Sequence, residues 1–145
     1  MTRGDDTPDA AHRRPAGATD ATVAAVGRLS EALETVERAR GHLYSFHQLT
    51  GSADLALGDA VDRLDRAGHT ELAARLRRDL VGRNVLPGRW TFQIVEEYDD
   101  GYYAAFRAAE RAARDELLAG KRHLHEAEMK EDRRTHGALG HEARP

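Results

Sequence analysis

The chain has 145 residues, of which 32% are charged and 6% aromatic, and its formal net charge is -3. This length predicts a single domain, and the net charge argues against a general nucleic-acid binder, which normally presents a basic face. Cysteine is absent, which excludes disulfides, thiol catalysis and cysteine-based zinc sites. We find neither an apolar run near the ~20 residues that cross a bilayer nor the apolar core of a signal peptide. We therefore expect a cytoplasmic protein that does not bind nucleic acid or membranes.

Residues 1–18 contain Gly, Pro, Asp and Arg with almost no apolar side chain, so we expect a disordered leader there. Apolar residues at helical spacing then predict a first helix over 20–49, with Gly51 as a left-handed cap at its end. A second helix is expected from Ser52 to Gly68 and a third from Thr70 onward. Because few residues connect the second helix to the third, an antiparallel pair is favoured.

The stretch 83–106, RNVLPGRWTFQIVEEYDDGYYAAF, contains six of the eight aromatic residues and two acid pairs. Pro87-Gly88 predicts a turn in its first part. Apolar residues then alternate over 90–95 as in a strand, but a helical period continues for almost 25 residues. Since a lone strand would have no partner, we expect one long helix, with a kink or a new start at Gly101.

A short helix over about 121–132 and a flexible tail over 133–145 complete the prediction. The sequence thus predicts an all-α, antiparallel bundle of four main helices with a short C-terminal helix and disordered termini. Its domain would span 19–132.

The acids Glu96, Glu97, Asp99 and Asp100 have no basic residue four positions later, and on a helix they repel one another. A partner from elsewhere is therefore expected. They could form a cation site, a docking patch for a basic partner or a carboxylate pair for acid–base chemistry. Alternatively, they form a solvated face, or Asp99 or Asp100 caps a helix that begins at Gly101.

Arg40 and His47 stand at core-type positions of the first predicted helix. A core arginine must be paired or reach the rim. We hypothesise that Arg40 meets the carboxylate of Glu96, Glu97 or Asp100; the alternative is an arginine at the rim. His47 is expected to be a hydrogen-bonded core histidine rather than a ligand.

Metal ligands are a lesser possibility, for which the candidates are His47, His123, His125 and Glu128. On a helix only His125 and Glu128 converge, and the Glu-x-x-His and His-Glu-x-x-His patterns are absent. A solvated helix end is the favoured interpretation of the histidine-rich stretch. No complete catalytic or nucleotide-binding motif is found, so we expect no cofactor and favour a protein that is not an enzyme.

We expect a non-enzymatic protein-interaction or structural module that binds a protein partner or self-associates. Val85, Leu86 and Trp90 could instead plug the end of the bundle, which is the favoured interpretation of that loop. The predicted contact residues are Arg89, Trp90, Glu96, Glu97, Tyr98, Asp99, Asp100, Tyr102, Tyr103 and Arg40. The alternative function is a small-ligand or metal-binding bundle that uses the 96–100 carboxylates. At least three carboxylates within about 5 Å of one another, in a pocket that contains His47, would favour this alternative. Acids that face outward beside exposed tyrosines would favour the interaction module.

The stretches GRNVLPGRW, EEYDDGYY and HEAEMK resemble segments of small all-helical proteins from GC-rich bacteria. The resemblance covers about residues 40 to 135. It implies an all-helical fold, and it implies no activity and no functional residue.

Overall fold

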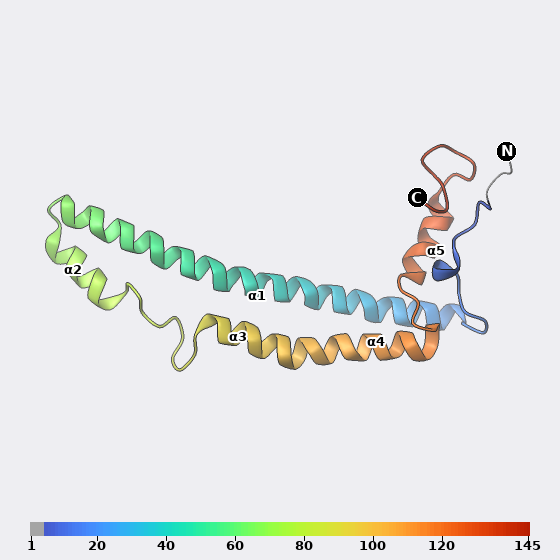
Figure 1. Cartoon of the computed structure of the whole chain (residues 1–145), viewed down its shortest axis with the longest axis horizontal. Coiled ribbons are helices and arrows are strands. Elements are labelled where there is room, and N and C mark those ends of the chain that lie inside the picture. Colours follow the sequence, from blue (N-terminus) through green and yellow to red (C-terminus); the bar gives the residue numbers. More distant parts are fainter. Residues whose placement is uncertain (1–4) are drawn as a thin grey trace. The chain divides into compact units, whose positions relative to one another are not determined.

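The computed structural model describes residues 5–145, and this part of the chain is all-α (Figure 1). Its helices are listed here in chain order: η1 (Ala10–His12), α1 (Asp20–Arg66), α2 (Thr70–Asp79), α3 (Thr91–Tyr98), η2 (Asp99–Tyr103), α4 (Ala104–Leu118) and α5 (Leu124–Arg133). Within the described residues there is no β-strand, and no helix combines the length and apolar character needed to cross a lipid bilayer. The all-α class is confirmed, whereas the antiparallel arrangement of the bundle stays a prediction.

Helix α1 is continuous over Asp20–Arg66, where we predicted one helix over 20–49 and a second from Ser52 to Gly68. Gly51 has no positive φ and therefore is not a left-handed cap. The flanking hydroxyls bond back to the helix: Thr50 Oγ1 donates to the Phe46 carbonyl at 2.7 Å and Ser52 Oγ to the Gln48 carbonyl at 3.1 Å. A hydroxyl that bonds to the carbonyl four residues earlier leaves the helix intact. Glycine and serine at 51–52 are therefore helix-interior residues.

The long helix predicted after the 83–89 loop is confirmed, because α3, η2 and α4 follow one another without a break. Its centre is a π-helical turn, η2, which contains Gly101 in place of the predicted kink or new start. Asp99 has helical dihedral angles, φ -60° and ψ -45°. The interpretation of Asp99 or Asp100 as the cap of a new helix is wrong, because no helix begins there.

The chain divides into two compact units, a division that the single domain predicted over 19–132 did not include. Unit 1 comprises the residues up to Thr35 together with Ala105–Pro145, and unit 2 comprises Val36–Ala104. The main apolar cluster of unit 1 contains Val23, Val26, Leu118 and Leu124, with Ala18 packed against it. The buried apolar residues of unit 2 are Val61, Ala73 and Val95.

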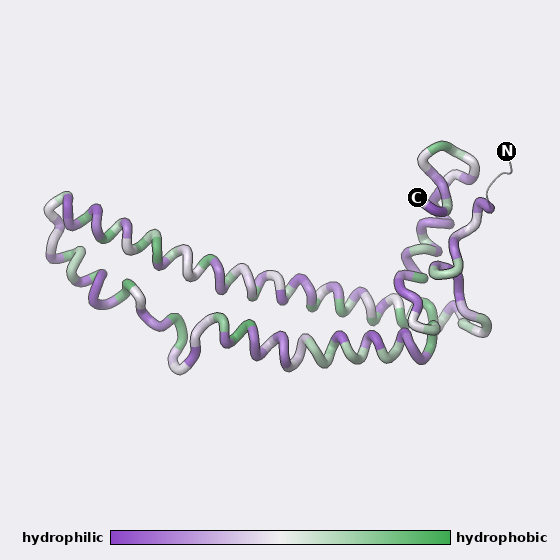
Figure 2. Tube along the Cα trace, viewed as in Figure 1, coloured by the Kyte–Doolittle hydropathy of each residue, from purple (hydrophilic) through white to green (hydrophobic). Residues whose placement is uncertain are grey.

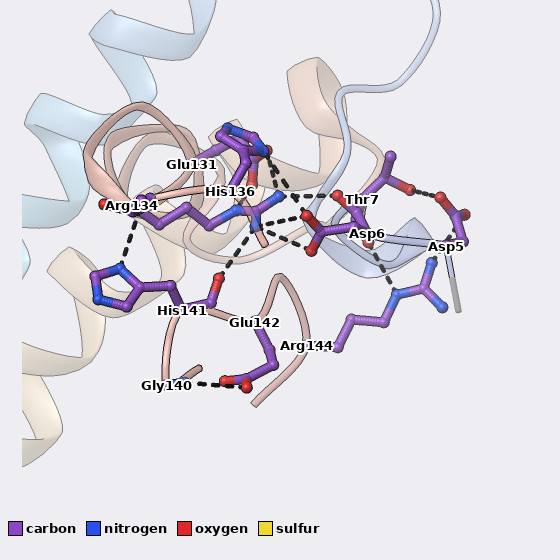
Figure 3. A network of polar contacts seen from close by, with 11 residues as sticks. Asp5, Asp6, Thr7, Glu131, Arg134, His136, Gly140, His141, Glu142 and Arg144 are labelled. Atoms are coloured by element: carbon purple, nitrogen blue, oxygen red, sulfur yellow. Dashed lines mark hydrogen bonds and ion pairs between the residues drawn. The ribbon is translucent and has the colours of Figure 1, made fainter. Parts of the chain in front are cut away.

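Polar contacts fix the ends of the described chain within unit 1 (Figure 3). The Arg134 side chain is fully buried. Its guanidinium donates to Asp6 at 2.9 Å, to Glu131 at 2.6 Å and to the His141 carbonyl at 3.0 Å. The hydrogen bond from Arg134 holds the pKa of Asp6 below its ordinary value, and the same guanidinium lowers the pKa of Glu131.

We predicted disorder over 1–18 and a flexible tail over 133–145. Residues 1–4 lie outside the described part. The rest of the leader makes ion pairs, since Arg14 contacts Asp20 and Glu128 in addition to the Asp6 contact above. We predicted the disordered leader from its lack of apolar side chains, whereas the contacts that it makes involve charged groups.

Helix α4 carries a buried ion pair in unit 1. Arg114 Nε donates to Glu110 Oε1 at 2.7 Å, and the two side chains are only 11% and 7% exposed. Ser30 Oγ donates to the same carboxylate oxygen at 3.0 Å, and Arg114 Nη1 donates to the Gly120 carbonyl at 3.1 Å. Burial alone would raise the pKa of Glu110, but the hydrogen bonds from Arg114 and Ser30 outweigh it, and the pKa is lowered.

Candidate functional site

The candidate site lies in unit 2 and begins in the loop before α3. Pro87-Gly88 forms the predicted turn, with Gly88 at φ 76°. At the start of α3 the Gln93 side chain accepts a hydrogen bond from the Trp90 N–H at 2.9 Å, which satisfies a donor that the helix start leaves open. Trp90 is 61% exposed, and its ring lies 5.1 Å from that of Phe92. The interpretation of this loop as a plug is wrong, because Val85 and Leu86 are exposed as well.

The π-helical turn η2 gathers three tyrosines. Tyr98 stacks on Tyr103 with ring centroids 6.3 Å apart and an interplanar angle of 19°, and it also contacts Tyr102 at 6.0 Å. In an α-helix, residues five apart point about 140° away from each other, whereas the wider π turn brings them to one face. Tyr102 remains 60% exposed, and the Tyr103 hydroxyl donates to the Glu37 carboxylate on α1.

Arg40 pairs with the acid cluster, as predicted. Its Nε and Nη2 atoms each donate to Asp99 at 3.0 Å, so the contact is bidentate. The partner is Asp99 and not one of the three carboxylates that we named. These hydrogen bonds hold the pKa of Asp99 below its ordinary value. The Arg40 guanidinium also lies 5.0 Å above the Tyr44 ring, a cation–π contact that the sequence did not reveal.

The other three acids differ in their surroundings. Glu97 pairs with Arg89 from the loop. The sequence has no basic residue four positions after any of these acids, and this spacing does not reveal the pair because Arg89 lies eight positions before Glu97. Glu96 and Asp100 are exposed and have no hydrogen-bond or ion-pair partner among residues 5–145. The cluster therefore offers two free carboxylates on its outer side.

The convergence of three carboxylates beside His47, which would favour the ligand-binding alternative, is not found among residues 5–145. His47 Nδ1 lies 2.7 Å from Thr91 Oγ1, so His47 is a hydrogen-bonded histidine, as expected. In the described part of the chain, no set of three metal-type ligands includes His47 or any acid of the 96–100 cluster. Two of the four carboxylates are already neutralised by arginine.

A groove of about 870 Å³ lies beside the loop in unit 2. The Asp54 carboxylate accepts a hydrogen bond from the Gly82 N–H at 2.8 Å and ties the loop to α1. The groove is lined by Thr50, Ala53, Asp54, Leu57, Leu80, Arg83, Asn84, Val85 and Pro87. The sequence did not reveal it, because its walls come from segments some thirty residues apart.

Unit 2 exposes most of the large apolar side chains that reach solvent in residues 5–145. Eleven of these fourteen side chains belong to it: Tyr44, Phe46, Leu49, Leu55, Leu72, Leu80, Val85, Leu86, Trp90, Phe92 and Tyr102. Figure 2 shows hydrophobic (green) segments between α2 and α3 and in α3, interrupted by hydrophilic (purple) ones. We call the exposed residues Trp90, Phe92, Glu96, Asp100 and Tyr102 the aromatic–acidic surface.

The remaining metal candidates lie in unit 1 and are not brought together as a set. Glu128 is paired with Arg14 at 2.5 Å, which lowers the pKa of Glu128. His125 lies against Gly27. His123 is close to two carboxylates, those of Glu126 and Glu34. Glu34 was not a sequence candidate, because it comes from the distant helix α1.

No protein-family model matches the chain, and neither the curated proteins nor the solved structures searched contain a match. The resemblance to small helical proteins of GC-rich bacteria therefore stays a prediction, and function must be argued from the geometry of this chain.

Proposed function

We propose that this protein is a non-enzymatic helical module that self-associates, and that a second copy of the chain covers the aromatic–acidic surface of unit 2. The observation that carries the proposal is the imbalance of unit 2, which buries Val61, Ala73 and Val95 but exposes eleven large apolar side chains. Large apolar side chains exposed in such number favour an interaction surface. Trp and Tyr are the side chains that most often dominate binding energy.

Charge favours a second copy as the occupant. Glu96 and Asp100 are exposed carboxylates without a partner among the described residues, and unit 2 also exposes Arg75 and Arg83 without an ion pair there. In a twofold interface each contact is made twice, so acids of one copy can meet arginines of the other. Unit 2 has few buried apolar residues, so binding of a partner subunit to its folded state would add to its stability.

The only tryptophan of the chain reports directly on this interface. Trp90 is 61% exposed in the single chain, so its emission should move to shorter wavelength when a second copy buries it. We expect this blue shift to appear with rising protein concentration, in parallel with a doubling of mass in sedimentation equilibrium. A different protein on the same surface would leave the pure chain a monomer with unchanged emission, and this result would overturn self-association.

Substitutions locate the interface. We expect Trp90→Ala to weaken dimerisation by about 30-fold, equivalent to the ~2 kcal/mol of an interface hot spot. The matched control is Leu139→Ala, because Leu139 is 96% exposed but lies in unit 1; it should leave the dissociation constant unchanged. Reversing charge with Glu96→Lys should also weaken dimerisation, and adding Arg75→Glu should restore part of the loss. Equal dissociation constants for all variants would show that the surface is not the interface.

A further inference from the structure

We infer that unit 1 binds a divalent transition-metal ion, such as Zn²⁺, between Glu34 of α1 and the residues His123 and Glu126 at the start of α5. One ligand atom of each of these side chains lies within 4.8 Å of the other two. Zinc binds imidazole nitrogen and carboxylate oxygen at about 2.0–2.2 Å, so ligand atoms around it are ~3.3 Å apart. Binding would therefore bring the three ligand atoms closer together than they lie in this structure.

None of the three side chains has another partner among residues 5–145. No hydrogen bond or ion pair joins them to a basic group, although nearby acids such as Glu128 and Glu131 are paired with arginine. With a neutral imidazole the cluster holds two carboxylates that make no ion pair among the described residues, and these carboxylates repel each other. A divalent cation would remove this repulsion, and imidazole and carboxylate groups are both suitable ligands for it.

The backbone holds His123 in position for this role. His123 adopts a left-handed conformation, with φ 58° and ψ 32°, which is unfavourable for a residue other than glycine. Ala119 and Gly120 are left-handed as well, with φ 53° and 72°. These residues form the connection between α4 and α5, and they direct the start of α5 back toward α1. Unfavourable backbone of this kind gathers at functional sites.

Three protein ligands leave a coordination position open, which is the arrangement of catalytic rather than structural zinc. A cavity of about 280 Å³ shares His123 and Glu126 in its lining, together with His12 and Lys130. The ion would therefore carry a water or a small ligand on the side of this cavity. The site belongs to unit 1, whereas the surface proposed for self-association belongs to unit 2, so either proposal can fail without the other.

The test is equilibrium dialysis of the full, untagged chain against Zn²⁺, followed by elemental analysis. We expect one Zn²⁺ per chain. Glu34→Gln, His123→Asn and Glu126→Gln should each weaken binding at least tenfold, since even the loss of a residue that only hydrogen-bonds to a metal ligand commonly costs about 10–100-fold. Asparagine is chosen at 123 because it tolerates the left-handed conformation. The controls His69→Ala and Glu116→Gln, which alter exposed residues outside the cluster, should bind as the parent does.

A second measurement distinguishes this site from adventitious binding to other histidines. Because the ion links α1 to α5, Zn²⁺ should raise the thermal midpoint of the parent chain and should not raise that of His123→Asn. Binding of less than one ion per chain would overturn the inference. Equal affinity in all three cluster variants, or an unchanged thermal midpoint of the parent, would overturn it as well.

Discussion

Gly51→Ala tests whether α1 is a single helix. Gly51 has helical backbone, and a Cβ added there meets no heavy atom within 4 Å. Alanine is better than glycine in a helix interior by about 0.8–1.0 kcal/mol, so the substitution should raise the free energy of unfolding by nearly that amount. Were Gly51 a left-handed cap, as its sequence context suggests, alanine would cost about 1–2 kcal/mol. The two structures therefore predict changes of opposite sign.

The assay is urea unfolding followed by circular dichroism at 222 nm. With a slope of about 1–3 kcal/mol per molar urea, the expected gain moves the midpoint upward by roughly 0.3–1 M. The matched control is Gly27→Ala in the same helix, where the new Cβ would lie 2.9 Å from the Cβ of His125. Overpacking costs about 1–3 kcal/mol, which equals or exceeds the gain of about 0.8–1.0 kcal/mol from helix propensity, so this midpoint should not rise. A lower midpoint for Gly51→Ala would refute the continuous helix.

The other predictions concern three polar contacts. Glu110→Gln leaves the buried Arg114 charge without its carboxylate and should lower the free energy of unfolding in urea by about 3 kcal/mol or more; the double variant Glu110→Leu/Arg114→Met should recover most of the loss. The pKa of Asp99 lies below its ordinary value of 3.8, so the stabilisation by Arg40 is complete above that pH and disappears as the pH falls through the lower, folded-state pKa. Thermal midpoints should therefore fall less steeply for Asp99→Asn than for the parent between about pH 5 and 2, and equal slopes would contradict this. Arg134→Ala removes the partner of Asp6 and of the His141 carbonyl and should speed tryptic cleavage after Arg13 and Arg133, whereas unchanged cleavage rates at these two sites would show that the contacts do not hold these segments.

Two features of the sequence predicted much of unit 2: the helical spacing of its apolar residues and an arginine, Arg40, at a core-type position. The apolar spacing after residue 90 distinguished a long helix from a strand, because only a helix can satisfy its own backbone groups without a partner. The anomaly of Arg40 among apolar neighbours predicted an ion pair with the acid cluster, and the structure confirms one with Asp99. Its exact partner depended on the π turn, because such a turn changes which residues share a face.

The features that the sequence did not predict have two causes. Some helix-end signals are too weak to end a helix, and some contacts join residues that are far apart in the sequence. Gly51 and Ser52 carry the usual signals of a helix end, but a single glycine costs only about 1 kcal/mol, which is too little to break a helix whose other contacts favour it. The groove of unit 2 and the approach of Glu34 to His123 join residues far apart in sequence. Periodicity reports which face of a helix is apolar, but not which distant side chain lies opposite.

The division of unit 1 between two segments of the chain has a consequence for synthesis on the ribosome. Val23 and Val26 leave the ribosome early, whereas Leu118 and Leu124, which complete their cluster, follow only after the whole of unit 2. A nascent chain emerges at about 5–20 residues per second, so these valines stay uncovered for several seconds. Unit 2 is continuous in sequence and is complete before unit 1 can close. The first half of α1 is thus the segment of the nascent chain most in need of a chaperone.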